Sequence, residues 1–304
     1  MEKLPKVLVI MSTYNGEKFI NEQIDSILAQ KDIDVTLHIF DDLSKDSTVS
    51  IAKEYEKKNK NVKVHINEKN KNFTYNFLDA LFSFKDEQSY DYYAFADQDD
   101  FWVENKLISA INKIKEVGNC TLYSANLKIV DQNLEYAGNN MMSTRYVNKH
   151  YDIICKNIVT GCTAVFDNDF KNLVTKHYPE NIYLHDYWLA LIANYTKGAH
   201  FVYDICPDYI LYRQHGTNLI GENKGGLIKR AFKLIFKKKD PIKSTRNLVK
   251  RFYELFEDDI LESDKKIMNR FANVDKFKNR FVLFFKVRSN YSFKLKIKML
   301  INRY

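Results

Sequence analysis

The sequence lacks the features of a disulfide-stabilised, zinc-binding or membrane-spanning protein. Its four cysteines, Cys120, Cys155, Cys162 and Cys206, form no C-x-x-C pair, so we expect buried thiols in a reducing compartment. No stretch approaches the ~18 consecutive apolar residues that a transmembrane helix needs. The apolar segment 7–11 near the amino terminus is too short for the core of a signal peptide, which predicts a cytoplasmic protein.

Charge is distributed unevenly along the 304 residues. The net charge is +8, but residues 225–304 hold 22 basic and 8 acidic residues, a net charge of +14. Residues 1–224 hold 25 basic and 31 acidic residues, a net charge of −6. Such asymmetry is informative about partners rather than about the fold. We therefore predict two regions, a catalytic domain at 1–222 and a basic helical region at 223–304.

Apolar β-branched runs alternate with helical patterns in the first part of the chain. Strands are predicted at 6–11, 35–40, 62–66 and 92–96, and helices at 17–30, 48–58, 73–84 and from 103 to about 117. Further strands are predicted at 121–130, 200–204 and 208–212, a helix at 189–195, and a mobile loop at 137–149. This alternation is typical of an α/β fold whose mostly parallel sheet is flanked by helices on both faces.

Acidic residues follow the ends of predicted strands. The run 92–96 ends in Asp97, Asp99 and Asp100, and the run 35–40 ends in Asp41 and Asp42. Carboxyl ends of parallel strands meet at the edge where open α/β sheets bind ligands. Crowded carboxylates favour a hard cation such as Mg²⁺ or Mn²⁺, which can bridge to substrate phosphates. A solvated acidic turn that caps the next helix is the alternative.

Six segments in order over roughly 1–222 resemble family 2 glycosyltransferases, which have the Rossmann-like GT-A fold. They are Val-Ile-Met-Ser-Thr-Tyr-Asn-Gly (9–16), Phe-Asp-Asp-Leu-Ser-Lys-Asp-Ser-Thr (40–48), Phe-Ala-Asp-Gln-Asp-Asp-Phe-Trp (95–102), Thr-Gly-Cys-Thr-Ala-Val-Phe (160–166), His-Asp-Tyr-Trp (185–188) and Tyr-Arg-Gln-His-Gly (212–216). The last two resemble bacterial rhamnosyltransferase-like enzymes of surface-polysaccharide synthesis. The resemblance implies a nucleotide-diphosphate sugar as donor, either dTDP-rhamnose or a UDP-hexose.

The resemblance also implies a role for individual residues. Asp97-Gln98-Asp99 matches the D-x-D element, and a metal would be held by Asp99, Asp100 and His215, with the exact choice among the three aspartates open. Asp186 matches the catalytic base, and His185 and Trp188 beside it could contact the acceptor. The nucleotide-sugar pocket would be lined by Thr13, Tyr14, Asn15, Asp42, Asn72, Asp97 and Asp99.

A single base opposite a metal implies direct displacement with inversion, since the acceptor hydroxyl must lose its proton as it attacks. Some positions depart from the family pattern. Leu43 stands where a glycine is usual, and Asn72 replaces a loop glycine, since Asn tolerates the left-handed conformation. The Gln-x-x-Arg-Trp motif of processive enzymes is absent, so we expect one sugar per encounter. Arg213 could contact a phosphate or form a surface salt bridge.

Several alternatives stay open at this stage. The basic region could be a solvated face, bind an anionic membrane surface next to a lipid-linked acceptor, pack as a helical domain or form a homodimer interface. Nucleic acid is an alternative for this region alone, and we expect no nucleic-acid partner because the body of the protein is acidic. The region's basic amphipathic pattern favours the membrane surface at the inner face of the cell membrane. A nucleotidyltransferase would need a glycine-rich basic loop after the first strand, and 12–18 holds one glycine and one lysine. A catalytically inactive binding protein is the other alternative.

Overall fold

The computed structural model describes residues 3–140, 152–155, 157–214, 244–274 and 276–286. His215 and residues 223–243 of the predicted basic region lie outside these residues.

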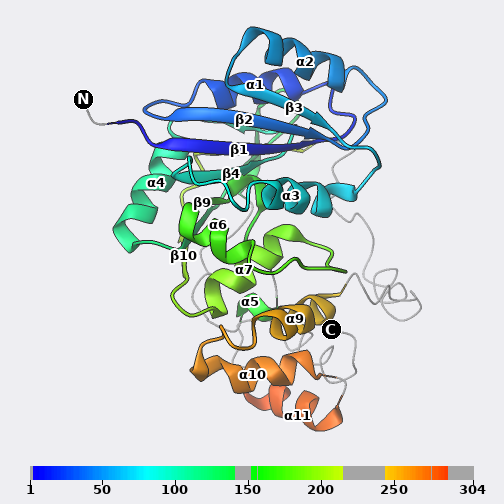
Figure 1. The fold of residues 1–304 in the computed structure, drawn as a ribbon, viewed down its shortest axis with the longest axis vertical. Helices are drawn as coiled ribbons and strands as arrows, with labels where there is room; N and C mark the ends of the chain where they lie inside the picture. The colour runs from blue at the N-terminus through cyan, green and yellow to red at the C-terminus, as the bar shows by residue number, and fades with distance from the viewer. Residues whose placement is uncertain (1–2, 141–151, 156, 215–243, 275, 287–304) are drawn as a thin grey trace.

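A seven-stranded sheet forms the centre of the fold, in the order β10-β6-β9-β4-β1-β2-β3 (Figure 1). Its strands are β1 (Lys6–Thr13), β2 (Asp34–Asp41), β3 (Val62–Ile66), β4 (Tyr92–Ala96), β6 (Thr121–Ala125), β9 (Val165–Asp167) and β10 (His200–Asp204). β1 is parallel to β2 and β4, while β9 is antiparallel to β4 and β6. The mostly parallel α/β sheet predicted from the sequence is thus present.

Helices cover both faces of this sheet. Side chains of β1 alternate, with Val7 and Val9 packed toward one face and Leu8 and Ile10 toward the other, as a strand buried on both sides requires. The first face is covered by α1 (Ile20–Leu28), α2 (Thr48–Lys58) and α4 (Lys106–Val117), and the second by α3 (Asn72–Ser83), α6 (Asn168–Val174) and α7 (His185–Tyr195). The short helix α6, capped by the Asp167 carboxylate, was not predicted.

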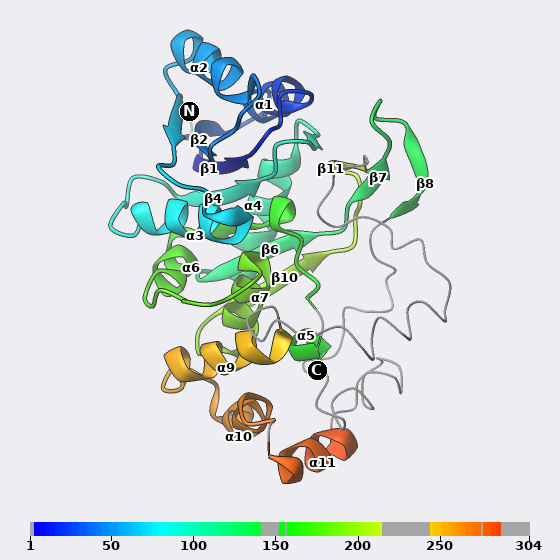
Figure 2. The same cartoon turned by 90° about the vertical axis from the view of Figure 1, so that its right-hand side faces the viewer.

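A second, four-stranded sheet lies beside the end of β4. It consists of β5 (Phe101–Trp102), β11 (Ile210–Arg213), β7 (Lys128–Val130) and β8 (Tyr136–Asn140), in that order. Figure 2 shows β7 and β8 projecting from the body of the molecule. The single strand predicted at 121–130 is therefore two strands, β6 and β7, which belong to different sheets. Residues 136–140, part of the predicted loop, form β8, and 141–149 lie outside the described residues.

The carboxyl-terminal helices are α9 (Thr245–Phe256), α10 (Glu262–Ala272) and α11 (Phe277–Lys286). The apolar face of α9 packs on α7, where the Phe252 and Phe256 rings meet the Trp188 indole at centroid distances of 6.1 and 5.9 Å. The Leu261 amide donates to the Tyr195 carbonyl at 3.0 Å. At least α9 and α10 are thus part of the same core as the sheet. None of the described helices is both long and apolar enough to cross a bilayer.

We predict that Phe256→Ala destabilises the whole fold. Phe256 is fully buried against Trp188 and His177, so truncation removes buried apolar surface and leaves a cavity, at a cost of about 3–5 kcal/mol. Phe277→Ala is the matched control, because its side chain is 65% exposed. Urea unfolding would measure both; equal, small losses would contradict the packing of α9 described here.

Candidate functional site

The acidic segment lies where β4 ends and β5 begins, at the carboxyl edge of the central sheet. Asp97 is half-buried and Asp100 is buried. Ligand atoms of Asp97, Asp100 and Cys162 all lie within 4.8 Å of one another, with Cys162 contributed by the short 3₁₀ turn Gly161–Thr163. The thiol was predicted to be buried, but its place among the carboxylates was not.

Burial and mutual repulsion raise the pKa values of the Asp97 and Asp100 carboxyl groups. Burial raises the pKa of Asp97 to about 7, helped by the charges of Asp99 and Asp186. Burial, then the charges of Asp99 and Asp97, also raises the pKa of Asp100 well above its usual range. Asp100 Oδ2 is buried without a hydrogen-bond partner. A divalent cation would supply the missing counter-charge and use this oxygen, so the residues present fit a metal.

A buried lysine stands behind the acidic segment. Lys106, in the first turn of α4, is 1% exposed, and its Nζ lies 3.2 Å from the centroid of the Trp102 ring. Burial lowers the pKa of Lys106 to about 7, against the opposing influence of Cys162 and Asp100. We did not predict this residue. Its signal in the sequence is a lysine on the apolar stripe of a helix, next to Leu107 and one turn before Ala110.

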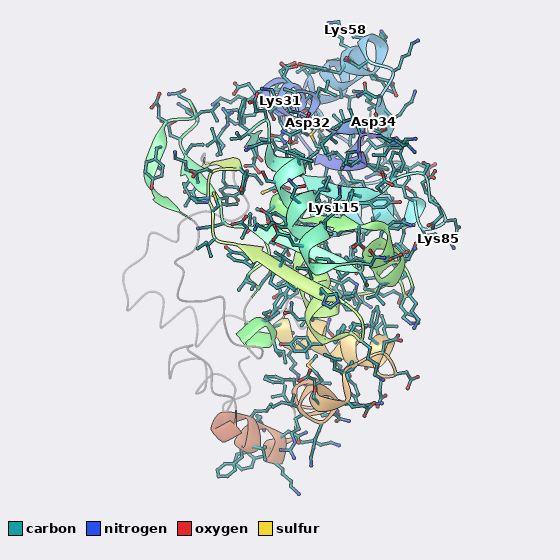
Figure 3. All side chains as sticks on the ribbon, turned by 90° about the vertical axis from the view of Figure 1, so that its left-hand side faces the viewer. Lys31, Asp32, Asp34, Lys58, Lys85 and Lys115 are labelled. Carbon is teal, nitrogen blue, oxygen red and sulfur yellow. The ribbon has the colours of Figure 1, made fainter. Side chains whose placement is uncertain are left out.

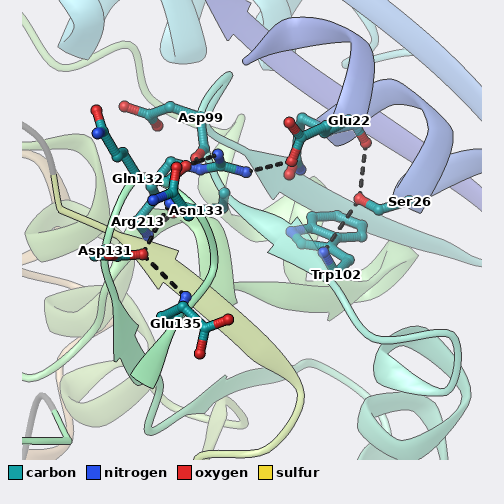
Figure 4. A network of polar contacts seen from close by, with 11 residues as sticks. Glu22, Ser26, Asp99, Trp102, Asp131, Gln132, Asn133, Glu135 and Arg213 are labelled. Atoms are coloured by element: carbon teal, nitrogen blue, oxygen red, sulfur yellow. Dashed lines mark hydrogen bonds and ion pairs between the residues drawn. The ribbon is translucent and has the colours of Figure 1, made fainter. Parts of the chain in front are cut away.

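Arg213 fixes the backbone of the acidic segment (Figure 4). It is 1% exposed. Its Nε donates to the Asp99 carbonyl at 3.1 Å, its Nη2 to Glu22 Oε2 at 2.7 Å, and its backbone amide to Asp100 Oδ1 at 3.3 Å. A further bond from Nη1 reaches the Gln132 carbonyl at 2.6 Å. Arg213 thus forms the salt bridge considered for it, with Glu22, but its own side chain is buried in a structural network rather than exposed on the surface. The phosphate contact considered for it stays a prediction.

The loop that follows β1 lies at the carboxyl edge of the central sheet. The Thr13 hydroxyl donates to Asp41 Oδ2 at 2.9 Å. The backbone of Tyr14 pairs with the Gln98 amide, whose Oε1 accepts from the Tyr14 amide at 2.8 Å and whose Nε2 donates to the Tyr14 carbonyl at 3.1 Å. A Cβ at Gly16 would lie 2.2 Å from Gln98 Oε1, so a larger residue there would displace the Gln98 side chain from its bonds to Tyr14. The predicted nucleotide loop and D-x-D element are thus directly bonded to each other.

Asn15 links this loop to the segment after β2. Its amide donates to the Ser44 hydroxyl, and its side-chain oxygen accepts from the Lys45 amide, both at 2.8 Å. Asn15 has a positive φ of 50°. Loops after two neighbouring strands are therefore held at a fixed separation across the edge.

Asp42 accepts hydrogen bonds from a third loop, which joins β3 to α3. It is 3% exposed, and its Oδ1 accepts from the Lys71 amide at 2.7 Å and from Asn67 Nδ2 at 2.9 Å. Leu43 has a φ of 67° and Asn72 a φ of 65°, so both adopt the left-handed conformation. The left-handed Asn72 is as predicted, and Leu43 keeps the turn that a glycine usually makes. The Asp42 backbone amide also donates to the Thr13 carbonyl at 2.8 Å, which ties this turn to the loop after β1.

Asp186 begins α7 opposite the acidic segment. Its Oδ1 accepts from the Tyr187 amide at 2.7 Å, and it is 8% exposed. Burial raises its pKa to about 7, while hydrogen bonds, including those from the Tyr187 amide and the Asn157 side chain, lower it. The Asp186 charge is among the causes that raise the pKa of Asp97. The structure therefore brings the predicted base and the D-x-D element together, from elements almost 90 residues apart.

The neighbours of Asp186 point into the core, which corrects the prediction that they contact an acceptor. His185 is 4% exposed, and its ring stacks on Phe77 at 4.3 Å. Neither of its ring nitrogens has a hydrogen-bond partner, and burial lowers its pKa to about 3. Trp188 is 0% exposed beneath α9. Both side chains support α7 rather than face the edge of the sheet.

Comparison with known proteins gives the family. The model of "Glycosyl transferase family 2" matches residues 8–174. The chain is 33% identical over 225 residues to the dTDP-rhamnosyl transferase RfbG of Shigella flexneri, covering 70% of this chain and 74% of the relative. It is 28% identical over 235 residues to the UDP-Glc:alpha-D-GlcNAc-diphosphoundecaprenol beta-1,3-glucosyltransferase WfgD of Escherichia coli, covering 75% and 85%.

Solved structures show the same fold. The S. aureus protein TarS in complex with UDP matches with a TM-score of 0.58 at 17% identity, over 93% of this chain and 75% of that one. The mannosyltransferase PcManGT from Pyrobaculum calidifontis, in complex with GDP-Man and Mn²⁺, matches with a TM-score of 0.53 at 15% identity, over 99% and 80%. The sequence match, the mostly parallel sheet and the acidic segment agree: this chain is a glycosyltransferase of family 2 with the GT-A fold.

Proposed function

We propose that this enzyme is an inverting transferase that moves one sugar from a nucleotide-diphosphate sugar to a hydroxyl group of a glycan or lipid-linked acceptor in cell-surface polysaccharide synthesis. The observation that carries the proposal is the juxtaposition of Asp97, Asp99 and Asp100 with Asp186 across the carboxyl edge of the sheet. The three aspartates after β4 would hold the metal at the donor diphosphate, and Asp186 would take the proton of the acceptor hydroxyl.

The donor would bind across the loops after β1, β2 and β3. Asp42 keeps its second carboxylate oxygen for a base N–H, and a uracil or thymine N3–H both suit it. Thr13, Tyr14, Asn15 and Asn72 line the same edge. The names of the relatives favour dTDP-rhamnose or a UDP-hexose, since one is a dTDP-rhamnosyl transferase and the other uses UDP-Glc.

A Mg²⁺ or Mn²⁺ ion would be held by Asp99 and Asp100, with Asp97 beside them and His215 completing the set. When bound, the ion neutralises negative charge that develops on the leaving diphosphate. The protein's own part is to hold these carboxylates in place through Arg213, which donates hydrogen bonds to the backbone carbonyl of Asp99 and to the carboxylate of Asp100. The Mn²⁺ in PcManGT, on the same fold, supports this assignment.

Asp186 acts as the general base. It takes the proton of the acceptor hydroxyl as that oxygen attacks the anomeric carbon from the side opposite the leaving diphosphate. Its raised pKa suits this task, because a stronger base accepts a proton more readily near neutral pH. A single displacement leaves the new bond with inverted configuration.

The proposed acceptor is supported by the name of a relative, and the proposed location by the charge of the carboxyl-terminal region. WfgD is named for an undecaprenol-linked acceptor, which supports a lipid-linked acceptor here. The net charge of +14 over 225–304 favours attachment to the anionic inner face of the cell membrane. We therefore propose a peripheral protein that works at that surface.

The donor site is tested by thermal stability with UDP, dTDP, GDP or CMP, each with and without Mn²⁺. We predict a metal-dependent rise with UDP or dTDP, roughly 5 °C at a hundredfold excess over Kd, because a ligand that binds only the native state stabilises it by about 2.7 kcal/mol. Asp99→Ala should lose the rise.

The control for this test is Asp86→Ala, since the Asp86 side chain is 90% exposed in the loop between α3 and β4. It should keep the full shift. If no nucleotide shifts the wild type, the donor site is refuted and a catalytically inactive binding protein becomes the better description.

The base is tested by Asp186→Asn. We predict a fall in kcat of about 10²–10⁴-fold with little change in nucleotide affinity, because the amide cannot accept the proton. In the wild type, kcat/KM should rise with pH up to about 7 and then level off, since Asp186 is protonated and inactive below its raised pKa. A wild-type profile that stays flat between pH 5 and 8, or a variant with full activity, would exclude Asp186 as the base.

A further inference from the structure

The three carboxyl-terminal helices use their apolar faces differently. α9 and α10 bury theirs: Leu248, Phe252 and Phe256 of α9 and Met268 and Phe271 of α10 are all 0% exposed. Their amphipathic pattern is therefore accounted for by packing within the protein. The apolar faces of α9 and α10 are therefore not available to a membrane.

α11 differs because it has apolar side chains on two sides. Leu283 is 0% exposed and anchors the helix to the core. On another side, Phe277 is 65% exposed and Phe281, one turn further, is 52% exposed. Their ring centroids lie 6.5 Å apart in a stacked arrangement. Phe277 and Phe281 are thus an aromatic ridge that the protein displays to its surroundings.

Basic residues lie on α11 beside this ridge. In the described residues 276–286 the charged residues are Lys276, Lys278, Arg280 and Lys286, and Asp275 before them lies outside the described residues. Lys276 and Lys278 flank Phe277 and are exposed, and the Arg280 guanidinium lies 5.6 Å from the centroid of the Phe277 ring. Elsewhere the surface mixes signs, as with Lys31, Asp32 and Asp34 in Figure 3. Figure 1 places α11 at the end of the molecule farthest from α2.

We propose that α11 is the element that docks this protein on an anionic lipid bilayer, with Phe277 and Phe281 in the boundary between headgroups and acyl chains and Lys276, Lys278 and Arg280 against lipid phosphates. Exposed aromatics beside cations are the composition of interfacial helices. A nucleic acid would satisfy the cations but would leave two stacked phenyl rings without an apolar environment. This inference deepens the membrane attachment proposed above by naming the helix that makes it.

The experiment measures flotation of the full chain with vesicles of phosphatidylglycerol and phosphatidylethanolamine, and with pure phosphatidylcholine. We predict binding to the anionic vesicles only. Phe277→Gln/Phe281→Gln should weaken the partition coefficient at least about tenfold, because two rings no longer leave water. Lys278→Gln/Arg280→Gln should weaken it about 25-fold, since each basic residue near the surface contributes about a factor of five.

Val117→Gln/Ile205→Gln is the matched control, because these apolar side chains are 45% and 56% exposed on other elements. It should bind vesicles like the wild type. All variants should keep the nucleotide-dependent thermal shift, which separates loss of docking from loss of fold or of the donor site.

Three results would overturn the proposal. One is equal flotation of the wild type and both α11 variants. Another is binding to duplex DNA or RNA that the α11 variants abolish while vesicle binding is absent. The third is a self-association, seen by sedimentation velocity without lipid, that Phe277→Gln/Phe281→Gln removes, since the ridge would then be an interface between two copies.

Discussion

The repulsion among carboxylates at the end of β4 is the constraint on which the rest of the site depends. Asp97 and Asp100 are brought together within 4.8 Å of each other and of the Cys162 thiol, and both have raised pKa values. Such an arrangement costs stability in the free protein, because the charged forms lose hydration and repel. In the proposed function, a cation and the diphosphate that it binds would restore the lost charge balance.

The surrounding structure serves to keep these groups close despite that cost. Arg213 donates hydrogen bonds to the Asp99 carbonyl and to the side chain of Glu22. Lys106 lies buried behind the same segment, and because burial lowers its pKa to about 7, its amine is partly neutral at neutral pH. Gln98 ties the same segment to the loop after β1. Asp186 approaches from α7, which is held between the sheet and α9 by the buried indole of Trp188. Rigid elements thus position every acidic group of the site.

Periodicity predicted the parallel sheet, its flanking helices and the meeting of Asp42 and Asp97 at one edge, because the carboxyl ends of parallel strands lie together. The role of Asp186 came from the family resemblance, since it lies in a helix and not at a strand end. Periodicity and motifs did not predict what depends on long-range packing. Arg213 and Lys106 are charged, and charge alone suggests a surface position, whereas the structure buries both. Likewise, the basic amphipathic pattern of the carboxyl-terminal region predicted membrane binding. The structure instead packs the apolar faces of α9 and α10 into the core that contains α7.

The proposed donor site can be tested in a crystal structure of the protein with Mn²⁺ and UDP or dTDP, with anomalous scattering measured at the manganese edge. We expect one anomalous peak bonded to oxygen atoms of the Asp97–Asp100 segment and of the diphosphate. The uracil or thymine ring should lie near Asp42, and the Asp186 carboxylate should face the open side of the site. Nucleotide bound elsewhere, or a peak away from these carboxylates, would contradict this proposal.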